Sequence, residues 1–268
     1  MATATANKAI PDEVLDILRQ GTWEDGGFKM PQMDRTLYQK TAKVLKALGG
    51  TWNRKAKATL FDDDGETAIR EACETGEYVD LKKAYQFFTT PDAIADLVMD
   101  ELELDRSSTF LEPSAGHGHL ICAAERACDK SAADVEHCCA VELNPEAWCV
   151  LEAMAEESSS IIKDLRCGDF LTCSPDDLGE FSHIGMNPPF CKSQDIDHVR
   201  HAYTFLAKGG RLVSIMSPGF TFRSDRKAQE FRDWLDTLSF SNWFFLPDNS
   251  FASSGTNVRT VLLIVDKE

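Results

Sequence analysis

Apolar and polar residues follow two different rhythms along the chain, and the change falls near Phe87. Before it, three stretches place apolar residues at the spacing of an amphipathic helix: residues 11–19, 34–48 and 66–76. The second stretch ends at Gly49-Gly50, a common helix stop. Residues 52–61 alternate apolar and basic side chains, as a strand or β-ribbon does. We therefore expect residues 1–84 to form a small, mainly helical region with a β-ribbon.

After Phe87, short apolar runs alternate with helical patterns. The runs predict strands at residues 109–111, 137–143, 162–167, 183–186, 211–216, 242–246 and 258–265. Helical spacing fills residues 91–103, 118–128, 145–157, 195–207 and 225–238. Such alternation predicts an α/β fold, with helices on both faces of a mostly parallel seven-stranded sheet over residues 85–268. Because no helix separates the last two strands, one of them is expected to run antiparallel.

Composition narrows the class of protein. No apolar run reaches the roughly 18–20 residues that span a bilayer, and the N-terminus lacks the apolar block of a secretory signal. We therefore expect a cytoplasmic protein. Nine cysteines, with no Cys-x-x-Cys, do not predict a disulfide framework. Cys138-Cys139 together with His117, His119 and His137 leave a metal site as an alternative, but reduced thiols in a core and no metal are favoured.

The net charge of −16 argues against a general nucleic-acid coat protein. The stretch from Lys29 to Lys57, however, carries eight lysines and arginines against Asp34 alone. Within it, Arg54, Lys55 and Lys57 are candidates for contacts with DNA phosphates. The alternative is a solvated helix face that balances the acidic remainder of the chain.

A glycine-containing segment, Glu112-Pro113-Ser114-Ala115-Gly116-His117-Gly118, follows the first strand of the second region. Glycines here let the backbone approach a ligand closely, and the next helix directs its N-terminus towards it. Ile121 stands where a dinucleotide-binding motif has its third glycine. Glu112 would repel a pyrophosphate but attract a cationic amino-acid group.

Two further acids end the next two strands. Glu142 is placed to accept hydrogen bonds from ribose hydroxyls, and Asp169 to accept one from an adenine amino group. Each alone is compatible with a solvated strand end. Together with Glu112 they mark the carboxyl edge of the sheet, where ligands bind in open α/β folds.

These segments, with Asn187-Pro188-Pro189-Phe190, resemble the ordered motifs of DNA adenine-N6 methyltransferases that use S-adenosylmethionine (SAM). Phe87-Phe88-Thr89-Thr90-Pro91 resembles the motif that precedes the glycine loop in the gamma arrangement of that family. The likeness covers about residues 85–265 and implies the class I methyltransferase fold. Residues 48–55 and 251–258 are also similar to segments of phage and restriction-modification enzymes.

The resemblance implies roles for individual residues. The implied SAM contacts are Phe88, Thr89, Pro91, Glu112, Pro113, Ser114, Ala115, Gly116, Gly118, Glu142, Leu143, Asp169, Phe170 and Asn187. The implied catalytic residues are Asn187, Pro188, Pro189 and Phe190. Asn187 and the Pro188 carbonyl would accept hydrogen bonds from the adenine amine, and Phe190 would stack on a base flipped out of the duplex.

The motifs indicate the type of reaction more specifically than they indicate the substrate. Protein-glutamine and RNA amino-group methyltransferases share the Asn-Pro-Pro-aromatic motif, and a non-catalytic SAM- or DNA-binding decoy is a further alternative. Family members with long recognition sequences carry a separate target-recognition domain after the last motif, and we expect none here. We therefore expect DNA specificity to be weak, or to come from residues 1–84 and loops 191–199 and 219–227, the last of which contains Arg223.

Overall fold

The computed structural model describes residues 8–24, 26–61, 65–78, 89–105, 107–131, 135–157, 160–254, 256 and 258–268. The chain divides into two compact units, Met1–Phe87 and Phe88–Glu268. No described helix is both long and apolar enough to cross a membrane.

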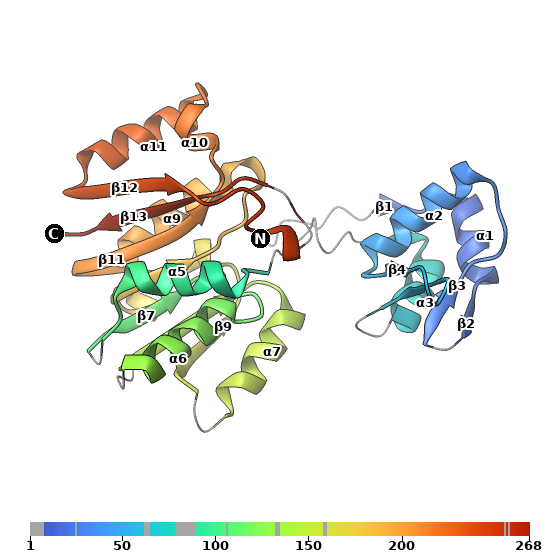
Figure 1. Ribbon diagram of the computed structural model, residues 1–268, viewed down its shortest axis with the longest axis horizontal. Coiled ribbons are helices and arrows are strands. Elements are labelled where there is room, and N and C mark those ends of the chain that lie inside the picture. The colour runs from blue at the N-terminus through green and yellow to red at the C-terminus, as the bar shows by residue number, and fades with distance from the viewer. Residues whose placement is uncertain are drawn as a thin grey trace. The chain divides into compact units, whose positions relative to one another are not determined.

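The second unit is built on a seven-stranded sheet (Figure 1). Its strands are β7 (Thr109–Glu112), β8 (His137–Glu142), β9 (Ile162–Cys167), β10 (Phe181–Met186), β11 (Leu206–Met216), β12 (Phe240–Phe245) and β13 (Val261–Asp266). Their order is β12-β13-β11-β10-β7-β8-β9, and β13 runs antiparallel to both of its neighbours. The predicted α/β fold with one antiparallel strand is therefore confirmed.

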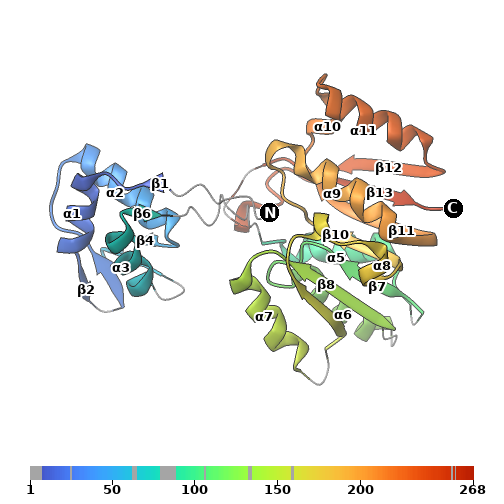
Figure 2. The same ribbon diagram turned by 180° about the vertical axis from the view of Figure 1, so that it is seen from behind.

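Helices cover both faces of this sheet. They are α5 (Asp92–Leu102), α6 (His119–Ser131), α7 (Pro145–Ala155), α8 (Pro175–Leu178), α9 (Gln194–Ala202), α10 (Gly219–Phe222) and α11 (Arg226–Thr237). The two opposite views show α5, α6 and α7 on one face and α9 on the other (Figures 1 and 2). Alternation along β8 divides the core accordingly, because Cys138 packs in the cluster of α5 and α6 and Cys139 in the cluster of α9 and α11.

The largest error in a predicted boundary concerns residues 195–207. The expected helix over residues 195–207 ends at Ala202, a short 3-10 helix spans Tyr203–Phe205, and β11 already begins at Leu206. Leu206 pairs with Phe181 at the start of β10, and a register shift follows before the regular pairing of His183 with Arg211. Residues 206–210 thus extend the strand at its start, before the apolar run. Their sequence has little strand pattern, and pairing with β10 accounts for the extended conformation.

The first unit contains three described helices: α1 (Asp12–Gln20), α2 (Arg35–Ala47) and α3 (Gly65–Thr75). Asp34 caps α2, since its side chain accepts hydrogen bonds from the backbone N–H groups of Thr36 and Leu37 at 2.7 and 3.0 Å. Gly49, at φ +95°, follows the end of that helix, as the Gly49-Gly50 stop predicts.

The same unit also contains more sheet than the sequence pattern indicates. Its strands are β1 (Lys8–Ala9), β2 (Thr22–Glu24), β3 (Gly27–Lys29), β4 (Thr51–Asn53), β5 (Ala58–Leu60) and β6 (Glu77–Tyr78). β4 and β5 are the predicted β-ribbon, and with β2 and β3 they form a four-stranded sheet of order β2-β3-β5-β4. The β2–β3 hairpin is too short to show a period in the sequence.

Gly185, next to the end of β10, generates a stability prediction. A Cβ atom there would lie 3.0 Å from the Phe110 ring and 3.1 Å from Leu102 Cδ1, both in the core. Gly185→Ala should therefore lower the free energy of unfolding by about 1–3 kcal/mol, because overpacking displaces these side chains. Gly168→Ala is the matched control, since nothing lies within 4 Å of its Cβ position. Equal urea midpoints for the two variants would contradict the packing argument.

Candidate functional site

Glu142 joins the ends of two neighbouring strands. One carboxylate oxygen accepts a hydrogen bond from the Gly116 N–H, and the other accepts from the Asn144 N–H, both at 2.6 Å. The side chain is 8% exposed, so these charge-assisted bonds lie in largely dry surroundings. Glu142 therefore holds the loop after β7 against the end of β8, and each of its oxygens retains a second lone pair for a ligand hydroxyl.

The glycine loop needs its glycines for two reasons. Gly116 and Gly118 have φ of +54° and +78°, in a region of backbone conformation that residues other than glycine rarely adopt. A Cβ on Gly118 would also lie 3.0 Å from Leu151 and Met154 of α7. The Ala115 N–H donates to the Val141 carbonyl at 3.0 Å, which attaches the loop to β8. The loop thus enters α6 in a fixed path.

Glu112 lies beside this loop as a buried and incompletely paired carboxyl group. It is 2% exposed, and among the described residues its Oε2 atom has no hydrogen-bond partner. Burial raises the pKa of Glu112 well above its usual range, the negative charge of Glu142 raises it further, and a backbone hydrogen bond from Ile121 opposes both. A cationic group placed here would relieve the cost of that charge.

The residues that follow the next two strands, β8 and β9, differ in solvent exposure. Leu143, directly after β8, is 50% exposed and offers an apolar surface at this edge. Asp169 is exposed and caps a short 3-10 helix, accepting from the Leu171 N–H at 3.0 Å. The Phe170 ring is buried and packs against Phe205 at 5.0 Å between centroids, so only its backbone faces this edge.

The end of β10 brings Asn187 next to the start of α5. The Asn187 amide nitrogen donates to the Thr90 hydroxyl at 3.0 Å, which fixes the orientation of the amide. The Ser254 hydroxyl donates to the Thr89 carbonyl at 2.5 Å and secures the same segment from the other side. Pro91 is the N-cap residue of α5. Phe88, expected to contact a cofactor, lies outside the described residues.

The rest of the tetrapeptide and its continuation form a tight turn. Pro188 is buried, Pro189 is half-buried, and Phe190 is half-buried against the core cluster of α5 and α6. Lys192 and Ser193 follow in left-handed conformations, at φ 54° and 56°. The Arg223 guanidinium donates to the Ser193 hydroxyl at 3.3 Å. The structure thus brings Arg223 close to this turn.

Sequence reasoning missed a buried polar cluster on α9. Asp195, 1% exposed, accepts from the Ser217 N–H at 2.9 Å and from its hydroxyl at 2.7 Å. One turn later, His198 Nδ1 lies 3.4 Å from the Ser114 hydroxyl. The cluster therefore connects α9 to the loops after β7 and β11. The sequence could have indicated that Asp195 is buried, because it shares a helix face with the apolar Val199 and Ala202.

The candidate DNA-binding residues of the first unit lie on the β4–β5 turn. Arg54, Lys55 and Lys57 are exposed. The Asn53 side chain accepts from the backbone N–H groups of Lys55 and Ala56 at 2.9 and 3.0 Å, so the turn is preorganised.

Three of the nine cysteines, Cys128, Cys138 and Cys139, are buried in the core, and Cys149, Cys167 and Cys191 are exposed. Burial raises the pKa of the Cys139 thiol to about 12 and that of Cys138 well above its ordinary value. In the part of the chain that the structure describes, no cluster of three or more His, Cys, Asp or Glu side chains is arranged to hold a metal ion.

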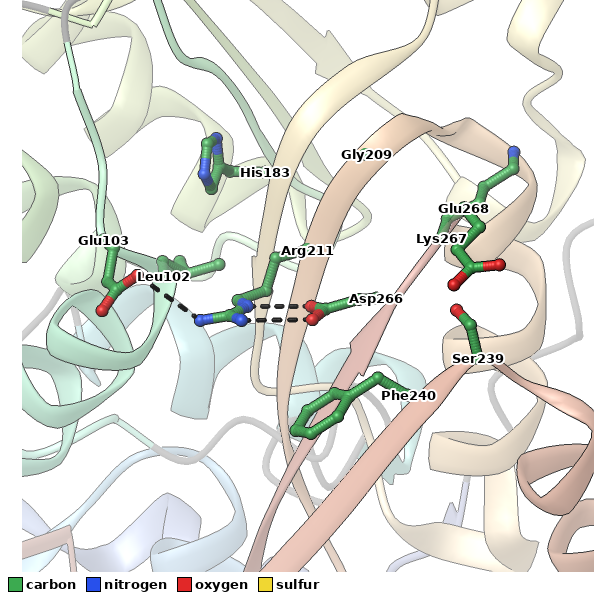
Figure 3. A pocket seen from close by; sticks show the side chains of 10 residues that line it. All are labelled: Leu102, Glu103, His183, Gly209, Arg211, Ser239, Phe240, Asp266, Lys267 and Glu268. Atoms are coloured by element: carbon green, nitrogen blue, oxygen red, sulfur yellow. Dashed lines mark hydrogen bonds and ion pairs between the residues drawn. The ribbon is translucent and has the colours of Figure 1, made fainter.

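A cavity of about 440 Å³ lies at the opposite, amino edge of the sheet (Figure 3). The Arg211 guanidinium inside it is paired with Asp266 at 2.8 and 3.1 Å and lies 3.7 Å from Glu103. The Arg211 charge is thus compensated by two carboxylates, and Lys267 also lines the cavity. None of the residues predicted to bind a cofactor lines this cavity, so the candidate site remains at the carboxyl edge.

Comparison with known proteins supports the fold assignment alone. No protein-family model and no curated protein matches the sequence. Among solved structures, the chain is similar to a type I restriction-modification methyltransferase subunit from Streptococcus thermophilus, at 18% identity and TM-score 0.58, over 77% of this chain and 50% of that one. It is also similar to the M protein of the type I restriction enzyme EcoKI, at 16% identity and TM-score 0.56, over 96% of this chain and 57% of that one.

A third similar structure is a Listeria monocytogenes protein described as a class I SAM-dependent methyltransferase. It matches at 12% identity and TM-score 0.55, over 96% of this chain and 87% of that one. The chain spans about half the length of the restriction-modification subunits that it matches. The second unit therefore has the class I methyltransferase fold, with its strand ends arranged as the sequence predicts.

His198 generates a prediction about acid stability. Burial is the main cause that lowers its pKa to about 4, from a usual value near 6.5. Between pH 6.5 and 4, His198 is therefore protonated in the unfolded chain but neutral in the folded chain. Folding stability falls as the pH is lowered across this range, by about 3 kcal/mol at pH 4. His198→Gln should show a shallower fall between pH 7 and pH 4 in urea titrations. A parallel fall in both proteins would rule out His198 as its source.

Proposed function

We propose that this protein transfers a methyl group from SAM to the N6 amino group of adenine in DNA. The observation that carries the proposal is the position of Asn187-Pro188-Pro189-Phe190 at the carboxyl end of β10, with the Asn187 amide oriented by Thr90. This motif has a carboxamide and a backbone carbonyl but no nucleophile, which fits methylation of an amine rather than covalent catalysis.

The residues after β7 and β8 fit SAM. Glu112 presents a buried oxygen that has no partner among the described residues, which suits the ammonium of the methionine part. Glu142 has lone pairs for the ribose hydroxyls, and the exposed Leu143 side chain offers an apolar surface for the nucleoside. Pro113, Ser114, Ala115, Gly116 and Gly118 would line the methionine part through their backbone, and Thr89, Pro91, Asp169 and Phe170 would complete the site.

The chain's own contribution to the reaction is positional and electrostatic. SAM supplies an electrophilic sulfonium methyl group. The Asn187 side-chain oxygen and the Pro188 carbonyl accept hydrogen bonds from the adenine N6 amine, which makes its lone pair available for in-line attack. Phe190 stacks on the base and offsets part of the few kcal/mol needed to flip it out of a duplex.

DNA contacts are assigned to two places. Arg223 lies hydrogen-bonded to the turn after Phe190, and the neighbouring Phe222 is 70% exposed. Arg54, Lys55 and Lys57 provide cations in the first unit. The fold similarity to restriction-modification subunits agrees with a DNA substrate. Mass spectrometry of nucleosides from cells expressing the protein should detect N6-methyladenine in DNA. Labelling confined to RNA or to protein glutamine would overturn the substrate, and SAM binding without turnover on any of them would indicate a decoy.

Asn187→Ala should reduce methyl transfer by about 100-fold or more, because it removes an acceptor that acts on the reacting amine. Its SAM affinity should change little. Asn242→Ala, on the exposed face of β12, is the control and should retain activity. The assay follows tritiated methyl incorporation into plasmid DNA, alongside calorimetry of SAM binding. Retention of more than roughly a tenth of the turnover would refute the assigned role of Asn187, whose loss should approach that of an oxyanion-hole donor.

Glu112→Gln should affect ligand affinity and stability in opposite directions. Loss of a charge-assisted contact should weaken SAM binding about 10- to 100-fold. Without SAM the variant should be more stable than the wild type near neutral pH. Because the folded state raises the pKa of Glu112, the wild-type protein loses folding stability as the pH rises and this carboxyl group ionises, whereas glutamine does not ionise. The measurements are calorimetry and urea unfolding, with Glu146→Gln, an exposed residue of α7, as the control. Unchanged SAM affinity would remove Glu112 from the site.

A further inference from the structure

The first unit contains a cavity of about 310 Å³ beside its basic turn. The lining residues are Met30, Tyr38, Ala42, Leu45, Lys46, Gly50, Thr51, Trp52 and Thr59. They come from α2, the following Gly49-Gly50 stop and the β4–β5 hairpin, with Met30 just after β3. The cavity therefore belongs to this unit alone, and its volume is at the small end of the range for ligand pockets.

Two aromatic side chains at this cavity remain accessible. Trp52 is 45% exposed and Tyr38 is 37% exposed. Their rings meet edge to face, with centroids 6.4 Å apart and planes at 89°. This contact holds the indole in place, so that a planar group can stack on it without first ordering the side chain.

The cations of the stretch from Lys29 to Lys57 are mostly uncompensated. Lys29 pairs with Glu24 at 2.8 Å and Lys40 with Glu13 at 2.5 Å. The other six cations between Lys29 and Lys57 form no ion pair within residues 8–24, 26–61 and 65–78: Arg35, Lys43, Lys46, Arg54, Lys55 and Lys57. Lys46 lines the cavity itself, and the preorganised turn after Asn53 presents three more. In a chain of net charge −16, this local excess is complementary to a polyanion.

We propose that this cavity binds an unpaired nucleobase of a DNA strand whose phosphates contact the β4–β5 turn. The proposal rests on the proposed DNA substrate and adds a second base-binding site, separate from the one at Asn187. Trp52 provides the stacking face, Tyr38 supports it, and Lys46 contacts the adjoining phosphate. An aromatic face surrounded by cations is the arrangement with which proteins hold single strands. The protein therefore prefers DNA with an unpaired or flipped nucleotide to a fully paired duplex.

The test uses the full chain with three 12-nucleotide ligands: a thymidine strand, a strand of the same length in which every base is replaced by an abasic analogue, and a paired duplex. Trp52→Ala should weaken binding of the thymidine strand about 10-fold, the scale of one base stacked on an aromatic ring. It should leave binding of the abasic strand unchanged, with the same salt dependence. Replacing Arg54, Lys55 and Lys57 together by Ala should weaken all three ligands and flatten the log–log salt slope by about 0.7 per phosphate contact on single strands.

Two controls separate stacking from a folding defect. Trp52→Phe retains an aromatic face and should recover most of the affinity. Phe240→Ala removes a similarly exposed ring, 43% exposed, from the second unit and should have no effect. Equal losses on the thymidine and abasic strands, or no loss with Trp52→Ala, would overturn the proposal that the cavity binds a base.

The test is independent of catalysis. If the wild type forms no N6-methyladenine but Trp52→Ala still loses base-dependent affinity, the proposed reaction fails and the nucleobase site stands. If methylation is detected and the thymidine strand binds no better than the abasic one, the nucleobase site fails and the proposed reaction stands.

Discussion

The hydrogen bonds of Glu142 are the interaction on which the rest of the candidate site depends. They attach the Gly116 backbone to the end of β8 in surroundings where a carboxylate charge needs partners. With the loop fixed, Glu112 is enclosed beside it, and the negative charge of Glu142 makes ionisation of Glu112 still less favourable. The site thus has one acid satisfied by the backbone and one with an oxygen that has no hydrogen-bond partner among the described residues.

Hydrogen bonds between loops extend this order along the whole carboxyl edge. Thr90 connects the start of α5 to Asn187, and Asp195 connects α9 to Ser217 after β11. Asp195 and Ser217 lie in segments that follow β10 and β11, whereas Thr90 lies just before α5. The parallel sheet places the segments after its strands side by side, and the polar side chains hold them together.

Much of the second unit could be predicted because β7, β8, β10, β11 and β13 are largely buried and read as apolar runs. Glu112, Glu142 and Asn187 stand at the ends of such runs, so their common edge followed from the topology. The partners of these residues did not. Nothing in the local sequence indicates that the Glu142 oxygens accept from Gly116 and Asn144, or that Asp195 reaches Ser217, because those contacts depend on tertiary packing. The cavity beside Trp52 escaped prediction for the same reason, whereas the β2–β3 hairpin was too short to show a period in the sequence.

The distribution of the thiols has a consequence for the chemistry of the protein in an oxidising environment. Because the thiolate is the reactive form, burial that raises the pKa of Cys138 and Cys139 also shields them from oxidants and alkylating reagents. The exposed thiols are Cys149, Cys167 and Cys191, and Cys191 directly follows Phe190. Oxidative damage would therefore reach the turn after the tetrapeptide before it reached the core, and would impair the site while the fold survived.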